Sequence, residues 1–345
     1  EDGPDAMHER IDTLRSRIRA AVTIGISGDY VAAEALMASA DIAAEKKDKT
    51  REREFLWRLW AHHPLTPLAQ QAEKRLKGQQ APLDMKVARA EQLIELHRNK
   101  QGLDVLEPLL PKLKLPDALA CRAWFAYGKG LRKERQHTRA IAALTPVVDK
   151  CQDRDLLPRA MYVLGSSRSI VDQVQGPQTY ERLAREYPDH SFADDALFYA
   201  ADLYVKTGRL ELASQRLKEV AKLYPQGDFL GEALFKDFWI SRTLKTADAG
   251  LPMLLEIERR FADADETYDL ERAQYWRART LQDKGDKKAA ADLFETIAVE
   301  HPATYYGLMA RTMLAELEPA RMERVAPKID FTQQERRGPW PLHAG

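Results

Sequence analysis

A small residue recurs through this 345-residue chain at a nearly constant interval. Because two packed helices can approach closely only where the facing side chains are small, such a recurrence marks helix crossings. A period of this length predicts an α-solenoid, in which each helical hairpin buries its apolar face against its neighbours. An ordinary helical bundle is the alternative for any single hairpin, but it does not explain the regular spacing. The recurring residues are Gly102, Ala140, Gly176, Ala213, Gly250 and Ala290, at steps of 38, 36, 37, 37 and 40 residues.

The clearest unit, residues 194–225, resembles the tetratricopeptide pattern. Gly208 is placed to form the turn between two helices, and Pro225 prevents the second helix from continuing. Residues 28–40 repeat the turn and second helix of this unit, with the first helix of that degenerate unit expected at residues 11–24. We therefore expect an all-α fold of about six to seven tetratricopeptide-like hairpins, wound into a right-handed superhelix over residues 1–318. The pattern positions are matched by Leu197, Ala201, Tyr204, Ala213, Leu217 and Pro225.

Beyond residue 318 the helical period stops. Pro319, Pro327, Pro339 and Pro341 interrupt this segment, and its last residues have the polar, proline-containing composition of a linker. We expect residues 319–345 to be a linker towards a C-terminal domain that is missing from the sequence.

The overall composition excludes several functions. The 53 basic residues balance the 53 acidic ones, so no net charge attracts the chain to nucleic acid. No apolar run is long enough to span a membrane. His62 and His63 are adjacent, without an acidic or cysteine partner at ligand spacing, so we expect no metal site. We find no phosphate-binding loop, no nucleophile motif and no catalytic pair of residues, and we expect no cofactor.

The two cysteines lie almost symmetrically about an expected interhelical turn near residues 135–136. Cys121 falls on the first helix of a hairpin and Cys151 at the end of the second. Residues at such positions lie at the same height in an antiparallel hairpin, so a disulfide is possible and would indicate an oxidising compartment. Two buried free thiols are the alternative interpretation.

The first helix of each hairpin lines the concave face in tetratricopeptide solenoids. One equivalent position carries an aromatic residue or methionine, and a position two turns later carries arginine in three units. Aromatic rings and guanidinium groups suit extended polar ligands such as glycans or peptides. The alternative is that the rings pack between repeats and the arginines are solvated. The candidate groove residues are Phe125, Arg132, Arg168, Phe198, Phe235, Trp239, Arg242, Tyr275 and Arg279.

The segment from His301 to Leu317 resembles the last superhelical helix of the soluble lytic transglycosylases. A Tyr-Tyr-Gly-Leu core follows a proline there, and Tyr305, Tyr306, Gly307 and Leu308 match it. Residues 185–204 and 274–302 also look like repeats of that family. The resemblance implies a bacterial periplasmic enzyme that cleaves peptidoglycan with a lysozyme-like domain. The catalytic motifs of that domain are absent from this sequence, so no catalytic residue is carried over.

Three hypotheses remain open. The first is the non-catalytic superhelical domain of a periplasmic lytic transglycosylase, which binds or threads peptidoglycan glycan strands and positions the catalytic domain. The second is a stand-alone periplasmic scaffold that binds peptide partners, such as cell-wall proteins, in its groove, and the third is a cytosolic repeat adaptor. A reading frame that continues into a lysozyme-like domain distinguishes the first from the other two.

Overall fold

The computed structural model describes residues 28–264 and 266–330. Every regular element in these ranges is a helix. The contacts within the chain form two compact units, residues 1–179 and 180–345, and each unit is described by itself. The expected first helix at residues 11–24 lies outside the described residues.

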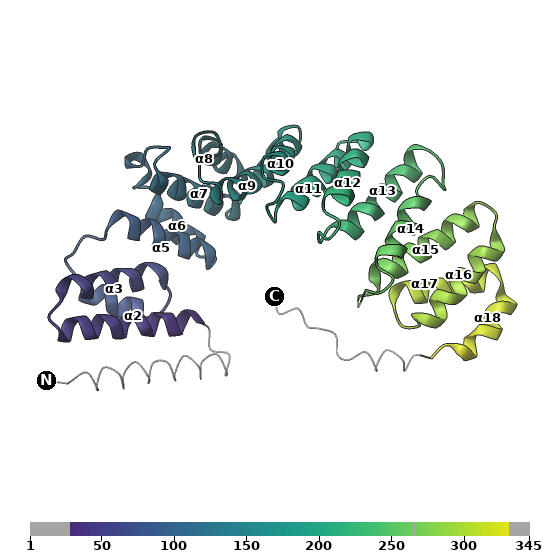
Figure 1. Ribbon diagram of the computed structural model, residues 1–345, viewed down its shortest axis with the longest axis horizontal. Coiled ribbons are helices and arrows are strands. Elements are labelled where there is room, and N and C mark those ends of the chain that lie inside the picture. Colours follow the sequence, from purple (N-terminus) through teal and green to yellow (C-terminus); the bar gives the residue numbers. More distant parts are fainter. Residues whose placement is uncertain (1–27, 265, 331–345) are drawn as a thin grey trace. The chain divides into compact units, whose positions relative to one another are not determined.

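Unit 1 consists of antiparallel helices that follow one another along the chain (Figure 1). Its elements are α2 (Gly28–Glu45), α3 (Lys49–His62), α4 (Pro67–Arg75), α5 (Leu83–Glu95), α6 (Asn99–Leu106), the 3-10 turn η1 (Leu110–Lys112), α7 (Ala118–Lys133), α8 (His137–Lys150) and α9 (Leu156–Val171). The paired helices α2–α3, α5–α6 and α7–α8 pack against each other, and α5 and α7 also pack against the first helix of the following hairpin.

The helix α10 (Gln175–Glu186) crosses the division between the units, and unit 2 continues the same alternation of first and second helices (Figure 1). The first helices of its hairpins are α11, α13, α15 and α17. The elements after α10 are α11 (Ala193–Lys206), α12 (Leu210–Leu223), α13 (Leu230–Leu244), α14 (Leu251–Arg260), α15 (Tyr268–Asp283), α16 (Lys287–Glu300), α17 (Tyr305–Leu317), α18 (Pro319–Val325) and the 3-10 turn η2 (Ala326–Lys328).

The recurring small residues are buried where helices meet, as the steric argument requires. Ala140, Ala213 and Ala290 are completely buried. Gly250 shows how close the approach is, because a Cβ atom there would lie 2.4 Å from the ring of Phe238. The prediction of an α-solenoid of helical hairpins is confirmed, and its small positions are helix crossings.

Helical structure extends past Pro319, where we expected a linker to begin. Proline is favoured in the first turn of a helix, and Pro319 opens α18 instead of ending the fold. Val325 is 1% exposed in the last apolar core of unit 2. Arg321 forms ion pairs with Glu295 at 2.7 Å and with Asp292 at 2.6 Å on α16. The folded unit therefore includes residues 319–328, and residues 331–345 of the expected linker lie outside the described residues.

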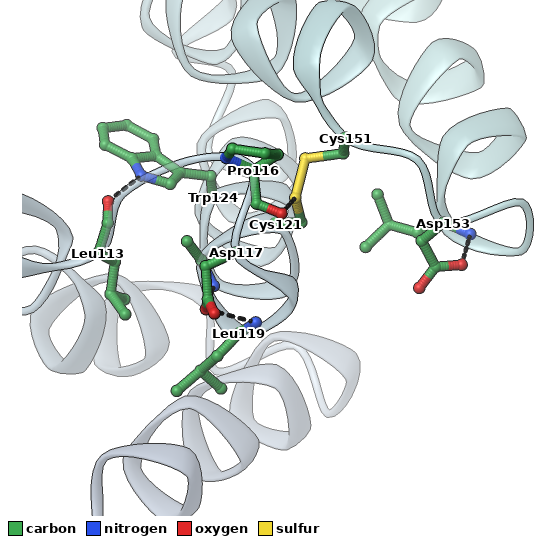
Figure 2. The surroundings of a disulfide bond; sticks show 10 residues. Leu113, Pro116, Asp117, Leu119, Cys121, Trp124, Cys151 and Asp153 are labelled. Atoms are coloured by element: carbon green, nitrogen blue, oxygen red, sulfur yellow. Dashed lines mark hydrogen bonds between the residues drawn. A yellow bond between two sulfur atoms is a disulfide. The ribbon is translucent and has the colours of Figure 1, made fainter.

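A disulfide joins Cys121 in the first turn of α7 to Cys151 at the end of α8 (Figure 2). The two Cα atoms are 6.1 Å apart, and the residues are separated by 30 positions in the sequence. Both cysteines are buried, and they lie at the same end of the antiparallel hairpin. The bond closes the open end of the α7–α8 hairpin, opposite its turn.

Loss of this disulfide is expected to lower the free energy of unfolding by about 3 kcal/mol, because the bond restricts the unfolded chain over a 30-residue loop. Urea unfolding followed by far-UV circular dichroism, with and without dithiothreitol, measures this difference. The double variant Cys121→Ala/Cys151→Ala is the control, since dithiothreitol has no bond to reduce in it. An unfolding midpoint of the natural chain that does not respond to dithiothreitol would contradict the prediction.

Candidate functional site

The aromatic side chains expected to line a groove are packed between hairpins instead. In unit 1, Phe125 of α7 is 6% exposed, and the guanidinium of Arg159 on α9 lies 5.5 Å from its ring centre. A ring in this position is covered by the first helix of the next hairpin. The side chain of Phe125 therefore packs between two repeats.

Unit 2 repeats the same arrangement twice. The ring of Phe198 stacks on Phe229 at 4.4 Å, and the ammonium of Lys236 on the next first helix lies 4.8 Å from its centre. The ring of Phe235 is covered by the guanidinium of Arg272 at 4.0 Å. In each case a cation from one first helix lies over an aromatic ring of the preceding first helix.

Tyr275 is the last residue of this row. It is 2% exposed and packs against Phe294 and Tyr306 at ring distances of 5.8 and 5.4 Å. Periodicity placed these rings correctly at one helical position. However, Phe125, Phe198 and Tyr275 are buried, and the partly buried ring of Phe235 is covered by Arg272, so the expected open aromatic row is not formed.

The expected arginine row in unit 1 also connects helices. Arg132 of α7 donates a hydrogen bond to the Ser166 hydroxyl on α9 at 3.3 Å. Arg168 of α9 donates to Thr179 on α10 at 2.9 Å and to Thr145 on α8 at 3.4 Å. Arg168 therefore holds three helices together, and its replacement would affect the fold as well as any binding.

In unit 2, Arg242 is similarly engaged. It forms an ion pair with Asp283 at the end of α15, and it donates a hydrogen bond to the carbonyl of Ala247 at 3.1 Å. These contacts join α13, its own turn and the next first helix. Arg242 therefore connects successive hairpins.

Two tryptophans and an arginine on neighbouring first helices of unit 2 are partly exposed. Trp239 on α13 and Trp276 on α15 contact each other edge to face at 4.5 Å, and both are partly exposed. Arg279, one turn after Trp276, is also partly exposed and donates to the sulfur of Met313 on α17 at 3.2 Å. We call Trp239, Trp276, Arg279 and Met313 the tryptophan–arginine surface. It spans three consecutive first helices.

Two members of this surface, Trp239 and Arg279, were among the predicted groove residues, whereas Trp276 was missed. A signal for it exists in the sequence, since Trp239 and Arg242 are separated by the same three positions as Trp276 and Arg279, 37 residues later. A tryptophan and an arginine at this spacing lie on one side of a helix, and both are enriched in binding sites.

The Tyr-Tyr-Gly-Leu segment forms the start of α17. Tyr306 is 7% exposed and packs against Tyr268 and Tyr275, whereas Tyr305 and Leu308 are 66% and 49% exposed. Burial, followed by its interaction with Tyr268, raises the pKa of Tyr306. Tyr306 and Gly307 are thus explained by packing, whereas Tyr305 and Leu308 lie on the surface.

A pocket of about 650 Å³ lies between the loops that precede α11 and α13. Three aspartates, Asp189, Asp194 and Asp228, line it. Burial and the nearby carboxylates of Asp194 and Asp228 raise the pKa of the adjacent Asp195 to about 6. The described residues contain no group of three or more side chains arranged to bind a metal ion. The other lining residues are Pro188, His190, Ser191, Leu223, Tyr224, Pro225, Gln226 and Gly227.

Asp195→Asn is expected to stabilise the protein at neutral pH. A raised pKa means that the ionised form of Asp195 is disfavoured in the folded state. The protonated carboxyl group therefore contributes stability that is fully present below about pH 4, and this stability is lost as the pH rises through about 6. Because the carboxyl group is partly exposed, the gain at about pH 7.5 is at most about 1 kcal/mol, and it disappears near pH 4. Urea midpoints at the two pH values measure it.

Asp202→Asn is the matched control, on the same helix. Although burial opposes it, hydrogen bonds from Lys206 and Lys236 lower the pKa of Asp202. Its replacement is therefore expected to destabilise at neutral pH. The same sign for both variants would contradict the electrostatic explanation.

The described helices also provide no element that could cross a bilayer, since none is long and apolar enough.

Comparison with known families identifies tetratricopeptide repeats at residues 195–227 and 272–304. These segments cover most of hairpins α11–α12 and α15–α16, together with their following loops. No curated protein matches the chain.

Several solved structures share the fold. The C-terminal part of a tetratricopeptide repeat-containing protein from Cytophaga hutchinsonii aligns with a TM-score of 0.57 and 15% identity, over 79% of this chain and 97% of that one. The apo form of RapI aligns with a TM-score of 0.51 and 8% identity, over 90% and 99% of the two chains. At these identities the likeness establishes the fold alone: a tetratricopeptide-like α-solenoid.

Proposed function

We propose that this chain is a protein-binding scaffold that holds its partner on the first helices of unit 2. The observation that carries the proposal is the difference in exposure among the aromatic side chains of those helices. Phe198 and Tyr275 are only 6% and 2% exposed, whereas Trp239 and Trp276 are partly exposed and contact each other. Tryptophan is among the residues that contribute most to protein interfaces. A tetratricopeptide-like solenoid is suited to this role because it presents an extended surface on rigid helices.

Site-specific photocrosslinking tests the proposal. p-Benzoylphenylalanine replaces Thr243, which is exposed one turn after Trp239 on the first helix α13. Leu255, which is 49% exposed on the second helix α14, is the matched control position. In cells that naturally produce the protein, we expect a defined protein adduct from position 243 and none from position 255. Equal adducts at both positions, or adducts only at 255, would contradict the proposal.

A more specific candidate is the non-catalytic superhelical domain of a periplasmic lytic transglycosylase. The resemblance of residues 305–308 supports it, and so do the exposure of Tyr305 and Leu308 and a disulfide suited to an oxidising compartment. In this role the chain binds peptidoglycan strands or cell-wall proteins and positions a lysozyme-like domain. Sequencing the gene beyond codon 345 tests the candidate, which requires that the frame continue into such a domain.

The chain by itself is expected to release no anhydro-muropeptides from purified sacculi. Cleavage of a glycosidic bond needs a positioned carboxyl group in a substrate cleft, and the sequence contains none of the motifs that supply it. Chromatography of the soluble fraction after incubation measures this. Release that depends on the concentration of the chain would contradict the prediction.

A further inference from the structure

Arg279 differs from the other arginines on α13 and α15 in its partners. Arg242 pairs with Asp283, Arg272 with Glu232 and Asp269, and Arg277 with Glu258. Among the described residues Arg279 has no carboxylate within ion-pair distance. Its one hydrogen bond there goes to the thioether of Met313.

This bond leaves most of the guanidinium unused. A thioether sulfur is a weak acceptor, while guanidinium carries five donors in a planar fork that matches a carboxylate. The Nε of Arg279 is buried and has no hydrogen-bond partner among the described residues. The terminal N–H groups of Arg279 that do not bond Met313 can therefore donate to an anionic group.

An apolar contact lies directly beside the arginine. Trp276 is one turn before Arg279 on α15, and its ring meets Trp239 of the preceding first helix. Both tryptophans are partly exposed although they also pack on the core around Phe238 and Leu254. Because packing on the core already holds these rings in place, binding a partner costs little side-chain entropy. Rigid aromatic side chains of this kind are typical of the residues that contribute most to binding energy.

We propose that the tryptophan–arginine surface binds a protein segment that places an Asp or Glu carboxylate on Arg279 and an apolar side chain on Trp239 and Trp276. This inference rests on the proposed scaffold function and specifies the chemistry of its partner. Charge complementarity selects an acidic segment, because a basic one would leave Arg279 opposite a like charge. An apolar side chain next to the carboxylate gives the segment both the ion pair and the buried area.

A random peptide library of about twelve residues, displayed on phage and selected on the full 345-residue chain, tests the inference. We expect the selected peptides to share an Asp or Glu next to an aromatic or branched aliphatic residue. Synthetic copies should bind about 10-fold more weakly to Arg279→Gln and to Trp276→Ala. Binding should also weaken between about 50 mM and about 500 mM salt.

Arg259→Gln is the matched control. Arg259 lies on the second helix α14, is 66% exposed in its side chain and pairs with Glu256, so its loss should leave peptide binding unchanged. Arg279→Lys keeps the charge without the planar fork and should give an intermediate affinity. The melting temperature of each variant is measured to check that the fold is retained, and Arg279→Gln replaces a residue without an ion pair among the described residues.

Two results would overturn the inference. Selected peptides that bind with unchanged affinity to Arg279→Gln and Trp276→Ala would leave the scaffold function in place but remove its proposed site. Purified muropeptides that bind with the same dependence on Arg279, while no peptide is selected, would contradict both a protein partner and the scaffold function.

Discussion

Replacing Arg272 with alanine is expected to lower the free energy of unfolding by about 4 kcal/mol. Its side chain is 6% exposed, and its guanidinium lies between the rings of Phe235 and Tyr268, at 4.0 and 5.1 Å from their centres. It also pairs with Glu232 at 2.7 Å and with Asp269 at 2.6 Å. Truncation removes both stacking contacts and leaves Asp269, whose pKa burial already raises, without its cation.

Urea unfolding followed by circular dichroism measures the effect of Arg272→Ala. Arg259→Ala serves as the control, because Arg259 pairs with Glu256 on the surface of α14 with 66% of its side chain exposed. Surface pairs of this kind contribute about 0 to 1 kcal/mol. If the two variants lost similar stability, Arg272 would not be the internal connection that the burial indicates.

Gly307→Ala is expected to destabilise the end of unit 2 by about 4 kcal/mol, at the upper end of the effects of single substitutions. A Cβ atom at Gly307 would lie 1.7 Å from the carbonyl oxygen of His301. That carbonyl cannot move freely, since it accepts hydrogen bonds from the hydroxyl and the backbone N–H of Thr304. Thr304 in turn caps α17 by accepting from the backbone N–H of Gly307 at 3.1 Å.

Gly208→Ala separates this clash from the general cost of replacing glycine. Gly208 has a positive φ of 71°, and a Cβ atom there would meet nothing within 4 Å. Its replacement should therefore cost only about 1 kcal/mol of backbone strain. Equal losses for Gly208→Ala and Gly307→Ala, measured by thermal unfolding, would contradict the steric explanation of the Tyr-Tyr-Gly-Leu segment.

The solenoid could be predicted from the sequence because its main requirement is local and repeated. Small residues such as Ala140 and Ala213 must occur at each crossing, so their spacing alone reports the architecture. The boundary at Pro319 could not be predicted in this way. Proline ends one helix and can begin another, and only the packing of Val325 and the ion pairs of Arg321 determine which occurs.

The candidate site was predictable only in part. The period placed Phe125, Phe198 and Phe235 at one helical position, but whether a ring there is open depends on the next hairpin. Arg159, Lys236 and Arg272 cover these rings, and each lies on a different helix from the ring that it covers. A pattern based on one helix at a time cannot include that contact.

The most direct test of the account is hydroxyl-radical footprinting of the full chain with and without a selected acidic peptide. Without peptide, Trp239 and Trp276 should react faster than their buried neighbours Phe198 and Tyr275. Bound peptide should slow the modification of the two tryptophans and leave the side chains of the second helices α12 and α14 unchanged. Protection confined to the second helices, or rapid modification of Phe198 and Tyr275 in the free chain, would contradict the assignment of the tryptophan–arginine surface as the binding site.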